Sequence, residues 1–378
     1  MENCKHNFVV SLSYTITSLI YRALYISPPC NIILKIYISK HKTREKERER
    51  EKEKEEREME FWTRGEKLGE GSFGFVSIAR STSRHQQASG LPALMAVKSA
   101  KESDSKSLSK EKDLLDKFNG CASILRCFRE DYTTENGQQL YNILLEYASG
   151  GCLIDRIATG RKVMPEKMVS HYTKSILTAL SHIHKLGYVH CDVKPHNILL
   201  FKHTHDDGDW EEEAKLADFG SCVIFADEGN NSDFRGTVLY AAPESISRQK
   251  YVPESDVWSL GCTVLHMLTG NSPWTFDKHV TAKDVLFKIG CSDAIPEIPT
   301  TKKISKDAHD FLERCFVKDP TARWTADMLL NHPYIKNNNR HHRRHHHHGH
   351  LSSRFSHGIH SLVPHCFHVP KSATVHAC

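Results

Sequence analysis

The chain has 378 residues, a formal net charge of +5, and 26% charged and 39% hydrophobic residues. This length allows one to three domains, and the scattered positive excess does not indicate a nucleic-acid-binding protein. None of the twelve cysteines belongs to a Cys-x-x-Cys pair, so zinc-ligand spacing is absent. The cysteines therefore indicate reduced thiols, as in the cytoplasm or the nucleus.

The first segment, residues 1–58, is expected to lie outside any packed domain. Its apolar stretches are short and are interrupted by Arg22, Pro28 and Lys35, so we expect no stable membrane insertion. A secretory signal is the alternative, because Lys5 precedes an apolar run, although no small-residue cleavage site follows.

The end of this segment, Arg44–Glu58, alternates Glu with Arg or Lys. Such a run favours a solvated helix or a disordered leash. A purine repeat in untranslated RNA would encode the same alternation. The sequence from Met59 onward is typical of the start of a domain. We therefore expect residues 1–58 to be either disordered or an artefactual extension of the gene model.

A central segment, residues 61–335, combines strand and helix signals. Its first part is rich in strand patterns, and Asn136-Gly137 between two of them is a strong hairpin-turn signal. The expected strands are Lys67–Leu68, Gly74–Ile78, Leu94–Ser99, Cys127–Tyr132 and Leu140–Glu146. The expected helices include Leu108–Phe118, His171–Leu186 and Ser255–Thr269, where apolar residues recur at helical spacing. This order predicts an α+β fold with a small β-rich lobe followed by a larger α-helical lobe.

The first motif is a glycine-rich stretch, LGEGSFGFV, at Leu68–Val76. Strand signals lie on both sides of it, whereas a dinucleotide-binding fingerprint opens a helix. Glycine lacks a Cβ, so the backbone can approach the oxygens of a triphosphate closely. A plain glycine-rich hairpin is the alternative for this motif alone. The expected nucleotide-binding residues are Leu68, Gly69, Glu70, Gly71, Ser72, Phe73, Gly74, Phe75 and Val76.

Two further segments complete the expected nucleotide site. Lys98 closes an apolar strand, where a fixed cation would hold the α and β phosphates, and Glu111 on the following helix is placed to pair with it. Leu145 ends another apolar strand, so we expect it to line the adenine pocket as its gatekeeper. The backbone of Glu146 and Ala148 would hydrogen-bond adenine, and Ala96 also belongs to the expected nucleotide-binding set.

The most specific segment is VHCDVKPHNILL at Val189–Leu200. Asp192 is placed to accept the proton of an attacking hydroxyl group, and Lys194 to steady a γ-phosphate. Asn197 and the later Asp218 of the Asp-Phe-Gly motif are the expected magnesium ligands.

The ordered set of these motifs resembles the eukaryotic protein kinases. Ala242-Pro243-Glu244 and Arg323 fit the resemblance, which implies a buried ion pair between Glu244 and Arg323. Asp256–Gly261 is similar to the helix that anchors the catalytic loop. Lys194 and Thr237 resemble those of serine/threonine kinases.

The residues around these motifs are similar to those of the mitogen-activated protein kinase kinase kinases, above all the short plant members with an N-terminal kinase domain. The resemblance implies ATP and Mg²⁺ as cofactors and a downstream kinase as protein substrate. Another serine/threonine kinase of the same group, or a catalytically silent pseudokinase scaffold, is the alternative.

The sequence departs from the family pattern at Cys191, where the family carries an arginine that pairs with an activation-loop phosphate.

The remaining features of the sequence have structural interpretations that need no further function. The acidic cluster of Asp206, Asp207, Asp209 and Glu211–Glu213 is expected to be a solvated hairpin tip, with a metal or partner site as the alternative. Cys222 is expected to be a small packing residue, with a redox-sensitive thiol as the alternative. The His-rich residues 336–378 are expected to form a disordered tail, with adventitious metal binding as the alternative.

Overall fold

The computed structural model describes residues 61–71, 74–82, 90–159, 163–204, 210–225, 234–277, 279–300 and 304–339, together with the short strand at 367–368. Ser72 and Phe73 of the glycine-rich stretch lie outside the described residues, as do residues 1–58 and most of 340–378.

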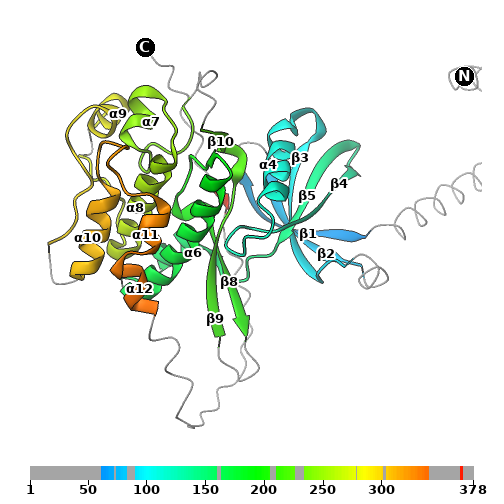
Figure 1. Cartoon of the computed structure of the whole chain (residues 1–378). Coiled ribbons are helices and arrows are strands. Elements are labelled where there is room, and N and C mark those ends of the chain that lie inside the picture. Colours follow the sequence, from blue (N-terminus) through cyan, green and yellow to red (C-terminus); the bar gives the residue numbers. More distant parts are fainter. Residues whose placement is uncertain are drawn as a thin grey trace, which may run out of the picture. The chain divides into compact units, whose positions relative to one another are not determined.

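The β-rich lobe is a single sheet that carries one helix (Figure 1). Its strand order is β11-β1-β2-β3-β5-β4, and the neighbouring pairs from β1 to β4 are antiparallel. Asn136 and Gly137 both have positive φ, as the turn between β4 and β5 requires. The elements are β1 (Trp62–Gly71), β2 (Gly74–Ser81), β3 (Leu94–Lys101), α4 (Lys106–Lys117), β4 (Cys127–Glu135), β5 (Gln138–Glu146) and β11 (Phe367–His368).

The second lobe is mainly helical and is built around two long helices, α6 (Glu166–Lys185) and α8 (Pro253–Thr269). Thirteen residues of α8 are buried, and they include the polar Ser255, Asp256, Ser259 and Thr263 beside the apolar side chains. The remaining helices are α5 (Leu153–Thr159), α7 (Pro243–Arg248), α9 (Ala282–Gly290), α10 (Lys306–Cys315), α11 (Ala326–Leu330) and α12 (Pro333–Asn339). The last of them continues four residues past position 335.

Short strands in this lobe carry the loops that matter for function. β7 (Tyr188–Val189) pairs with β10 (Val223–Ile224), and β8 (Ile198–Thr204) forms a three-stranded sheet with β6 (Gly151–Cys152) and β9 (Trp210–Leu216). The loop after β7 and the segment after β9 therefore start from paired, fixed backbone. Together the two lobes confirm the α+β two-lobed architecture that the sequence predicts.

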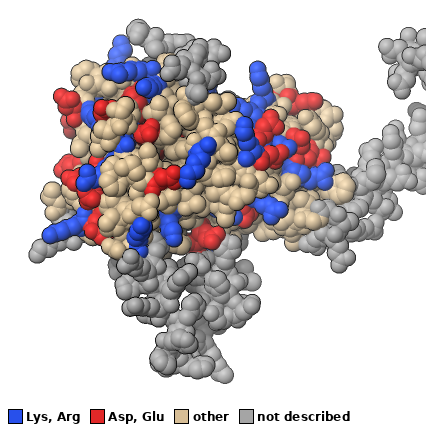
Figure 2. Space-filling view, in the orientation of Figure 1, with Lys and Arg blue, Asp and Glu red and all other residues tan. Residues whose placement is uncertain are grey.

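Charged side chains of both signs are interspersed on the face drawn in Figure 2, with no broad field of a single sign. None of the helices in the described part of the chain is both long enough and apolar enough to cross a membrane.

Candidate active site

Lys98 lies in the middle of β3, between Val76 on β2 and Ile143 on β5. Its ammonium group donates to Glu111 Oε2 at 2.6 Å and to Asp218 Oδ1 at 3.1 Å. Glu111 is buried on α4, whereas Asp218 follows β9 in the other lobe. One lysine thus joins the sheet, the helix and the second lobe, and it brings together three of the residues singled out in the sequence.

The electrostatics of this group follow from its burial and its mixed charges. Burial disfavours the charged form of Lys98, but the carboxylates of Asp218 and Glu111 outweigh that effect and raise its pKa. The Lys98 ammonium lowers the pKa of Asp218. Burial raises the pKa of Glu111, and Lys98 opposes that shift. The site therefore holds a permanent cation and an ionised Asp218 at neutral pH.

Asp192, Lys194 and Thr237 form a closed triangle of hydrogen bonds. Lys194 Nζ donates to Asp192 Oδ2 at 2.8 Å and to Thr237 Oγ1 at 2.7 Å, and the Thr237 hydroxyl donates to Asp192 Oδ1 at 2.8 Å. Because each group holds the other two, the carboxylate and the ammonium face the same small volume. A hydroxyl group and a phosphate could meet there.

Asn197 ends the 3-10 helix Pro195–Asn197, and its amide nitrogen donates to the backbone oxygen of Asp192 at 2.8 Å and to Asp192 Oδ2 at 3.0 Å. The amide oxygen of Asn197 is therefore the atom left to act as a ligand. The side chain of Asp218 is 46% exposed in relative area. A carboxylate and an amide oxygen are the donors that Mg²⁺ prefers, so the two residues fit a magnesium site.

The Asp-Phe-Gly turn is held by packing. Asp218 has φ 62°, in the left-handed region, and Phe219 is fully buried. The ring of Phe219 lies 4.9 Å from that of His190 and 5.3 Å from that of Phe118 at the end of α4, measured between centroids. These aromatic contacts of Phe219 hold the neighbouring Asp218 in its strained left-handed backbone conformation.

Asp256, fully buried on α8, anchors the catalytic loop. Its Oδ2 accepts from the amide of His190 at 2.8 Å and its Oδ1 from the amide of Cys191 at 2.9 Å. His184 on α6 contacts the same carboxylate at 2.8 Å. Charge-assisted bonds to backbone amides are among the strongest in proteins, so Asp256 fixes the loop one residue before Asp192.

The strands of the β-rich lobe place the other expected nucleotide-binding residues. Ala96 pairs with Leu145 across β3 and β5, and both side chains are buried. Gly74 has φ 154°, and a Cβ there would overlap the carbonyl oxygen of Ser99, so only glycine fits. Leu68, Val76 and Ala96 belong to one apolar cluster with Leu145.

Two of the expected residues use their side chains elsewhere. Glu70 is exposed and pairs with Lys67 at 2.7 Å. The Glu146 carboxylate accepts from Lys215 Nζ on β9, with both oxygens at 2.8 Å. The side chain of Glu146 is thus engaged with Lys215, and the expected hydrogen bond from its backbone to adenine stays a prediction.

The expectation that the acidic cluster is a solvated hairpin tip is wrong for Glu212. Its side chain is buried and contacts the guanidinium of Arg156 and the hydroxyl of Tyr172. Glu212 lies on β9 at a spacing of two from the buried Ala214 and Leu216. That alternation is a sequence signal that could have identified it as an inward-facing residue.

Cys222 is fully buried, and burial raises the pKa of its thiol to about 12. A thiol in that state is a poor nucleophile, in agreement with the expectation that Cys222 is a packing residue.

A model of the protein kinase domain matches residues 62–335, well over half of the chain, so the chain belongs to the protein kinase family. Its relatives indicate which group of protein kinases it is similar to. Mitogen-activated protein kinase kinase kinase 20 of Arabidopsis thaliana is 42% identical over 279 residues, which cover 72% of this chain and 78% of that protein. Mitogen-activated protein kinase kinase kinase 17 of the same plant is 37% identical over 275 residues, covering 72% and 69%. Mitogen-activated protein kinase kinase kinase 18 is 36% identical over 281 residues, covering 73% and 78%.

These findings make the chain a serine/threonine protein kinase of the mitogen-activated protein kinase kinase kinase type, as its sequence predicts. Nothing in the described site favours the pseudokinase alternative, because all four residues are present, with Lys98 bonded to Asp218 and Asn197 bonded to Asp192.

Proposed function

We propose that the chain phosphorylates a downstream kinase on serine or threonine, with Asp192 as the general base of the transfer. The observation that carries this proposal is the triangle of Asp192, Lys194 and Thr237, which holds a carboxylate and a cation against one another at 2.7–2.8 Å.

In the proposed reaction, a substrate hydroxyl oxygen attacks the γ-phosphorus of ATP. The bond between that phosphorus and the bridging oxygen of ADP breaks, and the hydroxyl proton passes to the carboxylate of Asp192. Lys194 balances the charge that builds on the transferred group. Lys98, held by Glu111, binds the α and β phosphates of ATP.

ATP with Mg²⁺ is the proposed cofactor pair, and Asn197 and Asp218 would hold the metal. The lowered pKa of Asp218, caused by the Lys98 ammonium, keeps its carboxylate ionised at neutral pH, which a hard cation requires. A bound magnesium ion would offset the negative charge of the phosphates.

The proposed substrate is a mitogen-activated protein kinase kinase. The relatives reported above are named mitogen-activated protein kinase kinase kinases, which means kinases of such a kinase. The chain covers more than two thirds of each of them. We also propose that residues 61–335 form the catalytic domain, with 1–58 and 336–378 as flanks. The cytoplasm or nucleus is the proposed compartment, and the eight cysteines of the described residues are all free thiols.

The test is a transfer assay with radiolabelled ATP, Mg²⁺ and a recombinant mitogen-activated protein kinase kinase whose own lysine for phosphate binding has been replaced, so that it cannot label itself. We expect label on serine or threonine of that protein, and about a hundredfold less or lower still with the Asp192→Asn variant. Label on general acceptor proteins alone would overturn the proposed substrate, and no label on any acceptor would overturn the proposed activity.

A further inference from the structure

Cys191, the residue before the proposed base, is buried in a small apolar cluster. Val189 and Tyr251 complete the cluster, and Val223 on β10 packs against it. The Cys191 thiol contacts the backbone oxygen of Val189 at 3.5 Å, and burial raises its pKa well above the usual value. The thiol is therefore neutral, and no charge on this side chain holds the neighbouring segment in place.

The adjoining segment, Arg235–Thr237, contacts this cluster and the catalytic loop through its backbone and the Thr237 hydroxyl. The backbone amide of Arg235 donates to the Tyr251 hydroxyl at 2.6 Å. Gly236 has φ 98°, and a Cβ at that position would overlap the carbonyl oxygen of Cys191. Thr237, the next residue, bonds to Asp192.

These contacts form one short path from Tyr251 to the proposed base. The Tyr251 hydroxyl fixes the amide of Arg235. Only glycine at position 236 lets the backbone approach the carbonyl oxygen of Cys191 in the catalytic loop. Thr237 is then placed so that its hydroxyl reaches Asp192 Oδ1 at 2.8 Å and Lys194 Nζ at 2.7 Å. A shift of Arg235 would be passed directly to Thr237, because only one residue separates them.

We infer that Tyr251 is a positioning residue for phosphoryl transfer: its hydroxyl holds Arg235–Thr237 so that Thr237 orients Asp192 and Lys194. The inference rests on the proposed role of Asp192. The Tyr251 side chain is buried, and burial raises the pKa of its hydroxyl to about 12, so it stays neutral across the physiological range. The positioning contact is therefore independent of pH there.

The first test is the variant Tyr251→Phe, which keeps the ring in the cluster and removes only the hydroxyl. Loss of one hydrogen bond is expected to lower kcat for a protein substrate about three- to tenfold. KM for ATP should not change, since Tyr251 belongs to a different apolar cluster from Val76, Ala96 and Leu145 of the expected nucleotide site. Tyr141→Phe is the matched control, because it removes a buried tyrosine's bond to Glu130 in the other lobe. This control should leave kcat as it is.

A double-mutant comparison separates positioning from general stability. If Tyr251 acts through Thr237, then Tyr251→Phe should reduce kcat in the native background and have almost no further effect in a Thr237→Ala background. Equal losses in both backgrounds would overturn the inference.

Hydrogen exchange gives a second measurement that does not depend on turnover. The amide of Arg235 should exchange faster in Tyr251→Phe than in the native chain, while the control Tyr141→Phe leaves it unchanged. Unchanged exchange at Arg235 together with unchanged kcat would overturn the inference. Should the native chain transfer no phosphate at all, the proposed function fails, and exchange alone then decides whether Tyr251 holds the segment.

Discussion

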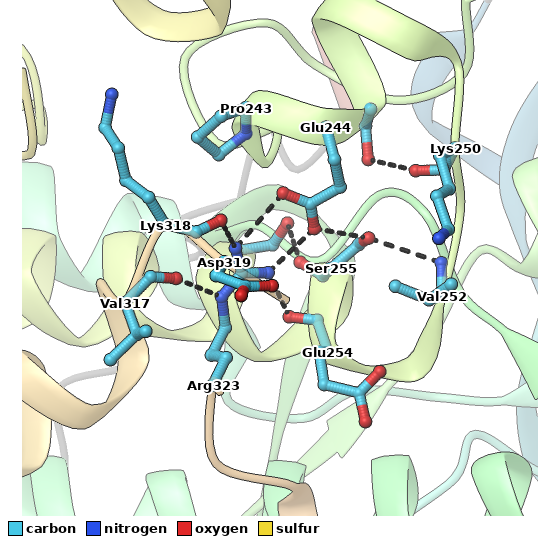
Figure 3. A network of polar contacts seen from close by, with 12 residues as sticks. Pro243, Glu244, Lys250, Val252, Glu254, Ser255, Val317, Lys318, Asp319 and Arg323 are labelled. Carbon is cyan, nitrogen blue, oxygen red and sulfur yellow. Dashed lines mark hydrogen bonds and ion pairs between the residues drawn. The ribbon is translucent and has the colours of Figure 1, made fainter. Parts of the chain in front are cut away.

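Arg323 and Glu244 form a two-pronged ion pair in the interior of the helical lobe (Figure 3). The arginine side chain is 0% exposed and the glutamate 6%. All five N–H groups of Arg323 have an acceptor: two oxygens of Glu244, and the backbone oxygens of Glu254, Val317 and Lys318. The pair thus ties α7, the end of the activation segment, to the start of α8 and to the loop after α10.

Replacing Arg323 with Met should destabilise the chain by about 3–5 kcal/mol, because it leaves the Glu244 carboxylate buried without a cation. Thermal unfolding followed by circular dichroism measures the change. Arg314→Met is the control, since the Arg314–Asp310 pair is 46% and 44% exposed and should contribute less than about 1 kcal/mol. A midpoint for Arg323→Met that equals the control would contradict the prediction.

Lys98→Met should lower turnover on the order of 10²-fold or more, since the ammonium places the phosphates and its loss removes an electrostatic group from the site. The chain should stay folded, because the buried Glu111 can take up a proton once its cation is gone. Steady-state kinetics and a circular dichroism spectrum measure the two effects. Lys112→Met is the control, because Lys112 is a lysine of α4 that pairs with the exposed Asp116. Near-native turnover in Lys98→Met would show that another cation binds the phosphates.

Asp192→Asn should reduce turnover on a similar scale, about 10²-fold or more, because an amide cannot accept the hydroxyl proton. The hydrogen bonds from Lys194 and Thr237 leave room for an amide oxygen in the same position, so binding of ATP should change little. Fluorescence titration with a nucleotide analogue measures that binding. Retention of near-full activity would show that the base has been assigned wrongly.

Leu145→Phe should weaken binding of adenine-competitive inhibitors more than it changes KM for a protein substrate. Leu145 on β5 is buried and pairs with Ala96 on the neighbouring β3, so a larger ring would extend into the expected adenine pocket. Inhibitor constants and KM values from one assay measure the two effects. Leu94→Phe, at the exposed start of β3, is the control. Equal effects on inhibitor and protein substrate would place the adenine pocket elsewhere.

The strands, the helices and the pairing of Lys98 with Glu111 could be predicted from the sequence, because each motif lies on a strand or a helix face that the apolar pattern marks. The contact of Lys98 with Asp218 could not, because it joins residues 120 positions apart in the two lobes. Asp256 was also identifiable as the loop anchor from its motif. The contacts of Glu212 and Tyr251 could not be predicted, since their partners Arg156 and Arg235 lie on other segments of the same lobe and meet them only when that lobe has folded. For Glu212, the one local sign of burial in the sequence was its place on the same strand face as the apolar Ala214 and Leu216.

The last prediction concerns activation. Cys191 places a buried neutral thiol where the family's arginine would bind a loop phosphate, and Arg235–Thr237 is held by a hydrogen bond to Tyr251 and by the close approach of Gly236 to the Cys191 carbonyl oxygen. We therefore expect phosphorylation to be dispensable for the active arrangement. Phosphatase treatment of active enzyme should leave more than about half of its turnover, because no charge-assisted bond to Cys191 is lost. Ser232→Ala should behave in the same way, and mass spectrometry verifies that phosphate has been removed. A collapse of turnover in both experiments would show that another cation, Arg235 foremost, binds a loop phosphate in place of the missing arginine.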